Sequence, residues 1–169
     1  MKDLLDLFEL GMARNIKEVV PFNYREGSVN LNVGCGNKEI PNTIGIDYPE
    51  WDADKDPLPY EDDSVDVIFA FHFLEHCKHP IKVLQDFQRV LKIGGVVNIV
   101  VPYYTSQMQA HDLDHKHTFC EETWRNLFSN EFYDKNRVSW HFEIGTNVII
   151  GIVERNLALV TQLIKTDKG

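Results

Sequence analysis

The fold is decided by the segment LNVGCGN, residues 31–37, read together with the segment TIGID, residues 43–47. Each segment begins as a short apolar strand. The first strand ends in Gly34-Cys35-Gly36, where glycines allow a sharp turn and a close approach to a ligand that a Cβ atom would prevent. The second strand ends in Asp47. A carboxylate at the tip of the adjacent parallel strand can accept hydrogen bonds from both hydroxyls of a ribose. The two segments therefore predict a nucleoside-binding turn.

A dinucleotide-binding turn fits this sequence less well. It would need a third glycine, but Glu39 occupies that position. No pyrophosphate-binding helix of normal length fits between Gly36 and Thr43. A Gly-x-Gly pair also occurs in ordinary turns, and that interpretation stays open from the pair alone.

The rest of the chain alternates strands with helices. Val65–Phe71 is an apolar run typical of a strand buried on both faces. A helix is expected from Pro80 through Lys92, ended by Gly94-Gly95. The other expected elements are an amphipathic helix over residues 2–20, strands over 29–33 and 96–101, a helix over 121–128, strands over 138–144 and 147–153 joined by a tight turn at Gly145-Thr146, and a strand or a helix over 154–165. This order predicts an α/β fold with a mostly parallel sheet, flanking helices and a late antiparallel strand pair.

Composition limits the classes of partner. The chain has 169 residues and a formal net charge of −9, which favours a single domain with no general attraction for nucleic acid or anionic lipid. No apolar run approaches the roughly 18 residues of a membrane span. The three cysteines, Cys35, Cys77 and Cys120, have no CxxC spacing, so we expect a reducing, cytoplasmic location.

Several motifs in order resemble a known family. The run LNVGCGN…IGIDYPE…DADKDPLPYEDDSVDVIFAFHFLEHCKHP…LQDFQRVLKIGGVVNIVVPYY resembles the class I S-adenosylmethionine-dependent methyltransferases, and most closely their compact branch with a short first loop. The similarity covers about residues 28–130. It implies a Rossmann-like fold and one methyltransferase-like domain over 1–169, with an N-terminal helix (1–20), a cofactor-binding core (28–130) and C-terminal strands (131–169).

The resemblance also implies a cofactor site for S-adenosylmethionine. The Gly34–Asn37 turn would hold the methionine part and Asp47 the ribose. The segment around Asp54-Lys55 would pass by the adenine, and Phe71-His72 would lie beside the sulfonium. The implied cofactor-binding residues are Gly34, Cys35, Gly36, Asn37, Asp47, Tyr48, Asp54, Lys55, Phe71 and His72. Most of the carboxylates between Glu50 and Asp66 indicate a solvated loop instead.

Three features depart from the family pattern. Asn32 stands where many members carry an acid below the glycine turn. Residues 48–64 show no third strand or preceding helix, so an abbreviated adenine pocket is expected. We also expect no separate substrate-capping domain after the last strands.

The segment from His72 to His76 spells H-x-x-E-H, which is also the pattern of inverted zinc peptidases. That pattern needs both histidines on one helix, whereas here it begins at a strand end and Pro80 starts the helix later. Some methyltransferases of this fold hold a divalent ion with E-x-x-E-H, which His72, Glu75 and His76 resemble. These side chains can equally be hydrogen-bonding groups, and the sequence assigns no metal site.

A second histidine cluster follows the fourth core strand, in HDLDHKHTF, residues 111–119. Asp112 and His115 match the Asp and His of the D-P-x-H-x-R-x-F loop of compact methyltransferases, while Leu113 replaces the proline. Loops after parallel strands surround the ligand site, so His115 is expected to orient the acceptor or to take its proton. Alternatively, His115 caps the helix near Glu121. The predicted catalytic residues are His72, His76 and His115, with His72 beside the sulfonium and His76 supporting from behind.

The expected function is methyl transfer from S-adenosylmethionine to a small polar acceptor, such as a sugar or metabolite, within a mouth that includes Tyr103, Tyr104 and Trp124. The alternative is a non-catalytic module that binds S-adenosyl compounds and regulates or scaffolds a partner. A weaker alternative is cleavage of the cofactor without an acceptor. The sequence indicates neither the acceptor atom nor the oligomeric state.

Overall fold

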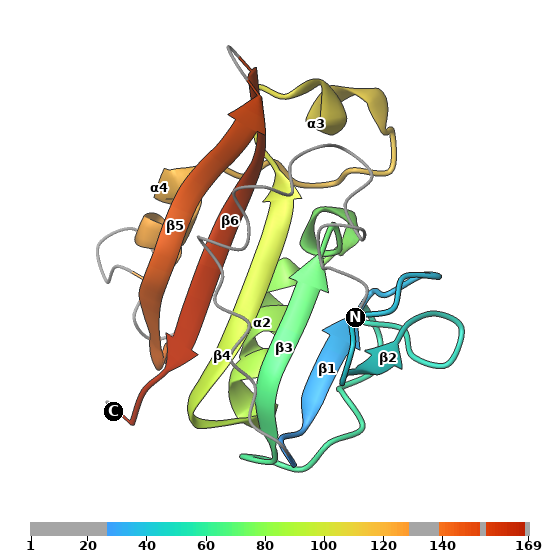
Figure 1. Ribbon diagram of the computed structural model, residues 1–169, viewed down its shortest axis with the longest axis vertical. Coiled ribbons are helices and arrows are strands. Elements are labelled where there is room, and N and C mark those ends of the chain that lie inside the picture. Colours follow the sequence, from blue (N-terminus) through green and yellow to red (C-terminus); the bar gives the residue numbers. More distant parts are fainter. Residues whose placement is uncertain (1–26, 129–138, 153–154, 168–169) are drawn as a thin grey trace.

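The computed structural model describes residues 27–128, 139–152 and 155–167. They form one six-stranded sheet with the strand order β2-β1-β3-β4-β6-β5 (Figure 1). The elements in chain order are β1 (Asn30–Val33), β2 (Ile44–Ile46), β3 (Val65–Phe71), the 3-10 turn η2 (Leu74–His76), α2 (Pro80–Val90), β4 (Leu91–Pro102), α3 (Gln107–His111), α4 (Glu121–Phe128), β5 (Phe142–Ile152) and β6 (Arg155–Lys165).

Strands β1 to β4 run parallel to one another. Strand β6 is antiparallel to both β4 and β5. The expected Rossmann-like α/β fold with a late antiparallel pair is therefore confirmed. Because the strands β1 to β4 are parallel, their carboxyl ends meet at one edge of the sheet. The residues that follow Val33, Ile46, Phe71 and Pro102 thus lie along this edge.

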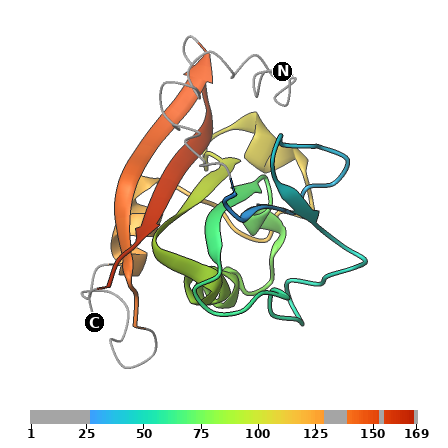
Figure 2. The ribbon, with the colours of Figure 1, turned by 60° about the horizontal axis from the view of Figure 1, so that its bottom comes forward.

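The core lies between the sheet and the helices on one of its faces. Strands β3 and β4 supply fully buried residues such as Ile68, Val97 and Ile99. Helix α2 buries one apolar stripe, which includes Leu84 and Phe87. Figures 1 and 2 show α2 and α4 on the same face of the sheet, with α2 behind β3 and β4 and α4 against β5. This helix layer holds the sheet edge in place.

The predicted end of α2 at Gly94-Gly95 is wrong. The helix ends at Val90, because Leu91 is already extended (φ −68°, ψ 139°) and pairs with Val65 of β3. Gly94, with φ of 80°, lies inside the long strand β4, where the pairing with β3 shifts register. The glycines therefore accommodate an irregularity in a strand and do not cap a helix.

The predicted turn at Gly145-Thr146 is also wrong. Strand β5 continues from Phe142 to Ile152 and pairs along its length with β6, with a register shift between Ile144 and Thr146. Gly145 sits at this bulge, and a Cβ there would lie 2.9 Å from Cδ1 of Ile164. The sequence allowed either a strand or a helix over residues 154–165. The structure shows strand β6 at Arg155–Lys165.

Three further segments were compared with the sequence predictions: the N-terminal helix, residues 48–64 and the segment after β4. The helix expected over residues 2–20 lies outside the described residues. Residues 48–64 hold no strand, as expected, so β2 is an edge strand among the residues the structure describes. Helix α3 was not expected, and its N-cap Ser106 Oγ accepts a hydrogen bond of 3.2 Å from Gln109 N. Within the described ranges, none of the helices is long and apolar enough to span a membrane.

Candidate functional site

The glycine turn lies at the carboxyl end of β1. Gly34 and Gly36 have φ of 68° and 50°, in the left-handed region that favours glycine. Gly34 N donates a hydrogen bond of 2.9 Å to Ile46 O, which ties the turn to the end of β2. A Cβ on Gly34 would lie 2.3 Å from Cδ2 of Phe73, because the phenyl ring packs directly against the turn. Gly34 is thus required both by its backbone conformation and by this close packing.

Asp47 at the end of β2 faces the same turn. Its Oδ2 accepts a hydrogen bond from Gly36 N, and its Oδ1 accepts one of 2.8 Å from Tyr48 N. The structure therefore brings together the two features that the sequence separated by eleven residues. A carboxylate has about four lone-pair sites, so these two bonds leave acceptor capacity on both oxygens.

A small cavity of about 160 Å³ opens beside Asp47. The residues that line this small cavity are Asp47, Tyr48, Trp51, Asp52, Ala53, Asp54, Phe73, His76 and Cys77. The rings of Trp51 and Phe73 lie 6.1 Å apart. Neither aromatic residue was predicted as part of the site. The sequence signal for both was that each aromatic residue lies within a few positions of a predicted strand end.

Asp54 and Lys55 differ in where they lie. Asp54 lines the small cavity, and its Oδ1 also accepts hydrogen bonds of 2.7 Å from Lys78 N and 3.3 Å from His79 N. It therefore fastens the segment that leads into α2. Lys55 is not among the lining residues, and its Nζ pairs with Asp52 Oδ2 at 2.7 Å with the side chain 74% exposed. The structure does not bring Lys55 to the cavity.

Cys35 and Asn37 belong to the turn but do not line the small cavity. Burial and the nearby Asp47 carboxylate raise the pKa of the Cys35 thiol, so it stays protonated at neutral pH. A Cβ on Gly45 would meet Cys35 Sγ at 3.0 Å, which shows how closely the thiol packs on β2. Asn37 is exposed.

Phe71 and His72 mark the end of β3. The Phe71 ring packs edge-on against Phe69, at a centroid distance of 5.7 Å. His72 has φ of 53°, and its N donates a hydrogen bond of 2.7 Å to Val100 O of β4. Its Nδ1 lies 3.3 Å from Oε1 of Glu75. His72 follows the last residue of β3 and His76 ends the 3-10 turn η2, so the two histidines do not share a helix face as the peptidase pattern requires.

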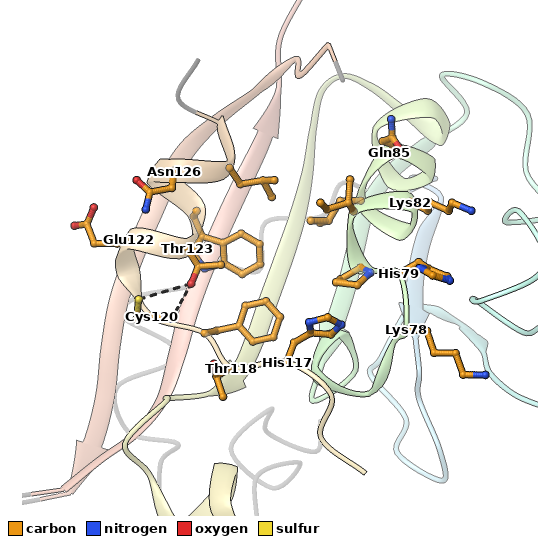
Figure 3. Close-up of a pocket in the computed structure, with 16 residues that line it drawn as sticks. Lys78, His79, Lys82, Gln85, His117, Thr118, Cys120, Glu122, Thr123 and Asn126 are labelled. Carbon is orange, nitrogen blue, oxygen red and sulfur yellow. Dashed lines mark hydrogen bonds between the residues drawn. The ribbon is translucent and has the colours of Figure 1, made fainter. Parts of the chain in front are cut away.

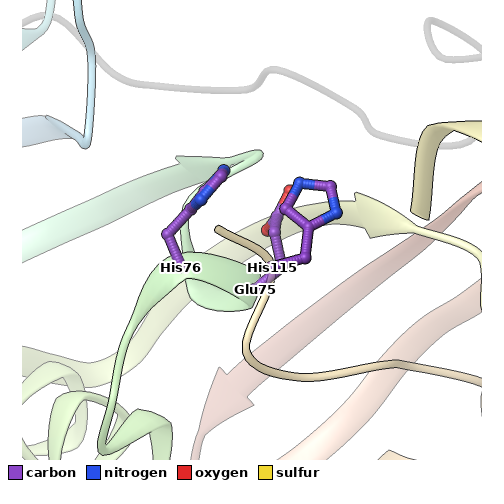
Figure 4. Close-up of side chains that lie close together, drawn as sticks. All are labelled: Glu75, His76 and His115. Atoms are coloured by element: carbon purple, nitrogen blue, oxygen red, sulfur yellow. The ribbon is translucent and has the colours of Figure 1, made fainter. Parts of the chain in front are cut away.

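Glu75, His76 and His115 form a second group, which we call the Glu75 cluster (Figure 4). One potential ligand atom from each residue lies within 4.8 Å of those of the other two. The rings of His76 and His115 are 4.7 Å apart at 66°. Glu75 is fully buried. The sequence predicted both histidines, but it did not predict that His115 would join Glu75.

The loop that carries His115 is fastened to η2. Lys116 N donates a hydrogen bond of 2.7 Å to Glu75 O, and Lys116 Nζ donates one of 2.7 Å to His76 O. His76 Nδ1 lies 3.3 Å from Asp114 Oδ2. The hydrogen bond from Lys116 and its charge hold the pKa of the Asp114 carboxyl below its usual range. His115 thus lies against η2, and its Nδ1 is 3.2 Å from Gln109 O.

A large cavity of about 820 Å³ lies on the helix face of the sheet, between α2 and α4 (Figure 3). Its walls include Leu84 from α2 and Trp124 from α4. Cys120 and Thr123 also line it, and Cys120 N donates a hydrogen bond of 3.1 Å to Thr123 Oγ1. None of the predicted cofactor or catalytic residues lines this cavity, so the site described above is a separate one.

The sequence itself matches a family model. Residues 8–99, more than half of the chain, match the family described as a methyltransferase domain. The chain belongs to this methyltransferase family. The class predicted from the motifs, a methyltransferase with S-adenosylmethionine as its cofactor, is thereby confirmed.

Several solved structures have folds similar to that of this methyltransferase. A chain of the Haloferax volcanii complex between the Trm112 methyltransferase activator and a methyltransferase matches with a TM-score of 0.67 and 18% identity, covering 94% of this chain and 90% of that chain. A SAM-dependent methyltransferase from Aquifex aeolicus matches with a TM-score of 0.60 and 18% identity, covering 97% and 94%. The [4+2]-cyclase SpnF matches with a TM-score of 0.62 and 16% identity, covering 96% and 80%.

At these identities the likeness shows the fold alone. The same fold is found in SAM-dependent methyltransferases and in a cyclase, so the fold alone does not specify the reaction. None of the curated protein sequences matches this methyltransferase.

Proposed function

We propose that this methyltransferase transfers the methyl group of S-adenosylmethionine to a hydroxyl of a small polar acceptor, such as a sugar or a similar metabolite. The observation that carries the proposal is the position of His76. It lines the small cavity beside Asp47 and also belongs to the Glu75 cluster. The small cavity and the Glu75 cluster are therefore neighbours at one edge of the sheet, which supports a cofactor site beside acceptor-side histidines.

The cofactor would bind along the glycine turn and in the small cavity beside it. The methionine part would lie along Gly34 to Asn37, and the ribose hydroxyls would bond to the acceptor capacity that Asp47 retains. The adenine would lie in the small cavity beside Tyr48 and Asp54, against the side chains of Trp51 and Phe73 that also line it. Phe71 and His72 would lie by the sulfonium because β3 ends there. Lys55 has no part in this arrangement.

The acceptor would bind next to the Glu75 cluster. Methyl transfer depends chiefly on alignment of the nucleophile, the methyl group and the sulfur. His115 would orient the acceptor hydroxyl or take its proton, and His76 would support it from the cofactor side. The exposed Tyr104 and Leu113 lie in the segments that follow β4, as expected for an open mouth. The net charge of −9 disfavours DNA or RNA as the acceptor.

Calorimetric titration with S-adenosylmethionine and with its demethylated product tests the cofactor side. A mass-shift screen against sugars and hydroxylated metabolites then tests the transfer. The proposal predicts binding of both S-adenosyl compounds and a methylated product from at least one acceptor class. Binding of the cofactor with no methylated product would favour the binding module, and free cofactor cleavage would favour the hydrolytic alternative.

Replacing His115 with Ala tests the acceptor side. We expect kcat to fall by about 100-fold or more, the usual scale for a lost acid or base group, while the Kd for the cofactor stays within about twofold. His111→Ala is the matched control, since His111 is exposed on α3 and outside the cluster. Turnover of an identified acceptor by the His115→Ala variant at the wild-type rate would show that the loop has only a structural role.

A further inference from the structure

Glu75 is an unusual residue for its position. Its side chain is 0% exposed, and neither carboxylate oxygen accepts a hydrogen bond within the part of the chain that the structure describes. A buried carboxylate is costly unless hydrogen bonds or an opposite charge compensate it. The nearby Lys116 does not do so, because its Nζ bonds to His76 O and to Asp114 Oδ1 at 2.7 and 3.0 Å. The group that faces the carboxylate is His72, whose Nδ1 lies 3.3 Å from Oε1 and is charged only when the ring is protonated, so within the described residues Glu75 has no permanently charged partner.

Both histidines of the cluster are held in the form that binds metals. His115 Nδ1 faces the carbonyl oxygen of Gln109 at 3.2 Å, and a carbonyl only accepts, so this contact favours the proton on Nδ1; Nε2 lies 3.8 Å from Asp112 Oδ2, beyond hydrogen-bond distance. His76 Nδ1 faces the carboxylate of Asp114 at 3.3 Å, which also only accepts. In the neutral rings the lone pair is then on Nε2. Metal-binding histidines commonly donate their other N–H to a carboxylate or a backbone carbonyl in this way.

We propose that Glu75, His76 and His115 bind one divalent cation, with Zn²⁺ as the representative of its class. Two imidazoles and one carboxylate form a donor set for zinc and related first-row cations, whereas Mg²⁺ and Ca²⁺ prefer oxygen ligands throughout. Ligand atoms around a zinc ion lie about 3–3.5 Å apart, given bonds of about 2.0–2.2 Å. The potential ligand atoms lie within 4.8 Å of one another, so the side chains would close by about 1–2 Å around an ion. The His76 side chain is 34% exposed.

A thiol does not compete for this role. Cys77 follows His76 directly, but its buried Sγ donates a hydrogen bond of 3.5 Å to Phe73 O and is not among the potential ligand atoms that come together. Three protein ligands also leave at least one coordination position open, as in catalytic zinc sites. Since His76 lines the small cavity, an ion held by these three residues would lie next to that cavity.

The ion's role in the reaction rests on the proposed function, whereas its binding does not. A cation bound here would take the acceptor oxygen as a ligand and lower the pKa of the hydroxyl. The hydroxyl proton passes to solvent, an oxygen lone pair forms the new bond to the methyl carbon, and the electron pair of the broken sulfur–carbon bond stays on sulfur. Atoms and charges balance without a further reactant.

The test is calorimetric titration of the full-length, chelator-stripped protein with Zn²⁺, without cofactor or acceptor. We expect one equivalent to bind to the wild type. His76→Ala and His115→Ala should each lower the affinity by about 100-fold or more, and Glu75→Gln by about tenfold or more. The control His111→Ala should stay within about twofold. His72→Ala should also stay near the wild type, because His72 contacts Glu75 Oε1 but is not one of the three proposed ligands. Circular dichroism checks that each variant is folded.

Titration with Co²⁺ gives a second readout. The proposal predicts visible d–d absorption without a thiolate-to-cobalt charge-transfer band, and loss of that absorption in His115→Ala. Absence of stoichiometric binding, a thiolate band, equal losses in His111→Ala and His115→Ala, or loss of binding in His72→Ala alone would overturn the proposal. Because these measurements use no cofactor, a failure of metal binding is distinct from a failure of methyl transfer.

Discussion

Asp47 joins two segments through one side chain. Its two oxygens accept from Gly36 N and Tyr48 N, so the carboxylate is oriented before any ligand arrives. An acceptor held in this way binds hydroxyls without ordering its own rotamers, which reduces the entropy cost of binding. The same bonds draw the glycine turn toward β2, beside the bond from Gly34 N to Ile46 O.

Replacing Asp47 with Ala should weaken binding of S-adenosylmethionine by about 1.5–3 kcal/mol, the usual scale for hydrogen bonds to a charged group. Titration calorimetry measures the Kd, and circular dichroism checks the fold. Asp56→Ala is the control, since Asp56 is exposed and does not line the small cavity. An unchanged Kd in a folded Asp47→Ala variant would show that the ribose is held elsewhere.

At the scale of elements, α4 depends on an aromatic stack. The fully buried Trp124 stacks with Phe119 at 5.4 Å and with Phe128 at 6.5 Å, which joins the helix to the segment before it. Asn147 Nδ2 donates a hydrogen bond of 3.0 Å to Glu121 O, which fastens the start of α4 to β5. The stack and this hydrogen bond together hold α4 against β5.

Trp124→Ala should lower the free energy of unfolding by about 3–5 kcal/mol, because a large buried side chain is removed. Trp124→Phe should cost clearly less, since the ring is retained and the indole Nε1 makes no hydrogen bond within the described residues. Urea denaturation followed by circular dichroism measures both values. Equal losses for the two variants would show that the stack is not the source of the stability.

At the scale of the whole molecule, three acidic side chains in the loops at the sheet edge, Asp52, Asp112 and Asp114, accept hydrogen bonds from nearby donors. The hydrogen bond from Lys55 holds the pKa of the Asp52 carboxyl below its usual range. The hydrogen bond from Lys116 does the same for Asp114, and the one from Asp114 N does so for Asp112. All three carboxylates are ionised and stabilised in the folded protein at neutral pH.

A carboxyl whose pKa is lower in the folded state stabilises the fold above its unfolded pKa of about 3.9, and this contribution is lost as the pH falls through the folded pKa. We therefore expect the free energy of unfolding to decrease below about pH 4–5. The double variant Asp52→Asn/Asp114→Asn should show a shallower decrease, whereas the exposed Glu61→Gln should follow the wild type. Urea midpoints measured from pH 3 to 7 test this, and parallel curves for all three proteins would contradict it.

The sequence by itself determined the parts of this protein that depend on local pattern. The strand Val65–Phe71 and the helix Glu121–Phe128 have the predicted bounds, because apolar periodicity and flanking residues act over a few positions. The glycine turn and Asp47 could be paired because parallel neighbouring strands end at the same edge. Gly94 and Gly145 misled the prediction, since glycine marks turns and bulges alike, and only the pairing partner distinguishes them.

The tertiary structure alone decided which histidines meet. His76 and His115 lie far apart in the chain, and they come together because β3 and β4 are adjacent and the loop after β4 folds back over η2. The bond from Lys116 N to Glu75 O secures that return. No periodicity within either segment encodes this contact. It arises from strand order and from backbone hydrogen bonds between distant segments, which exist only once the sheet has formed.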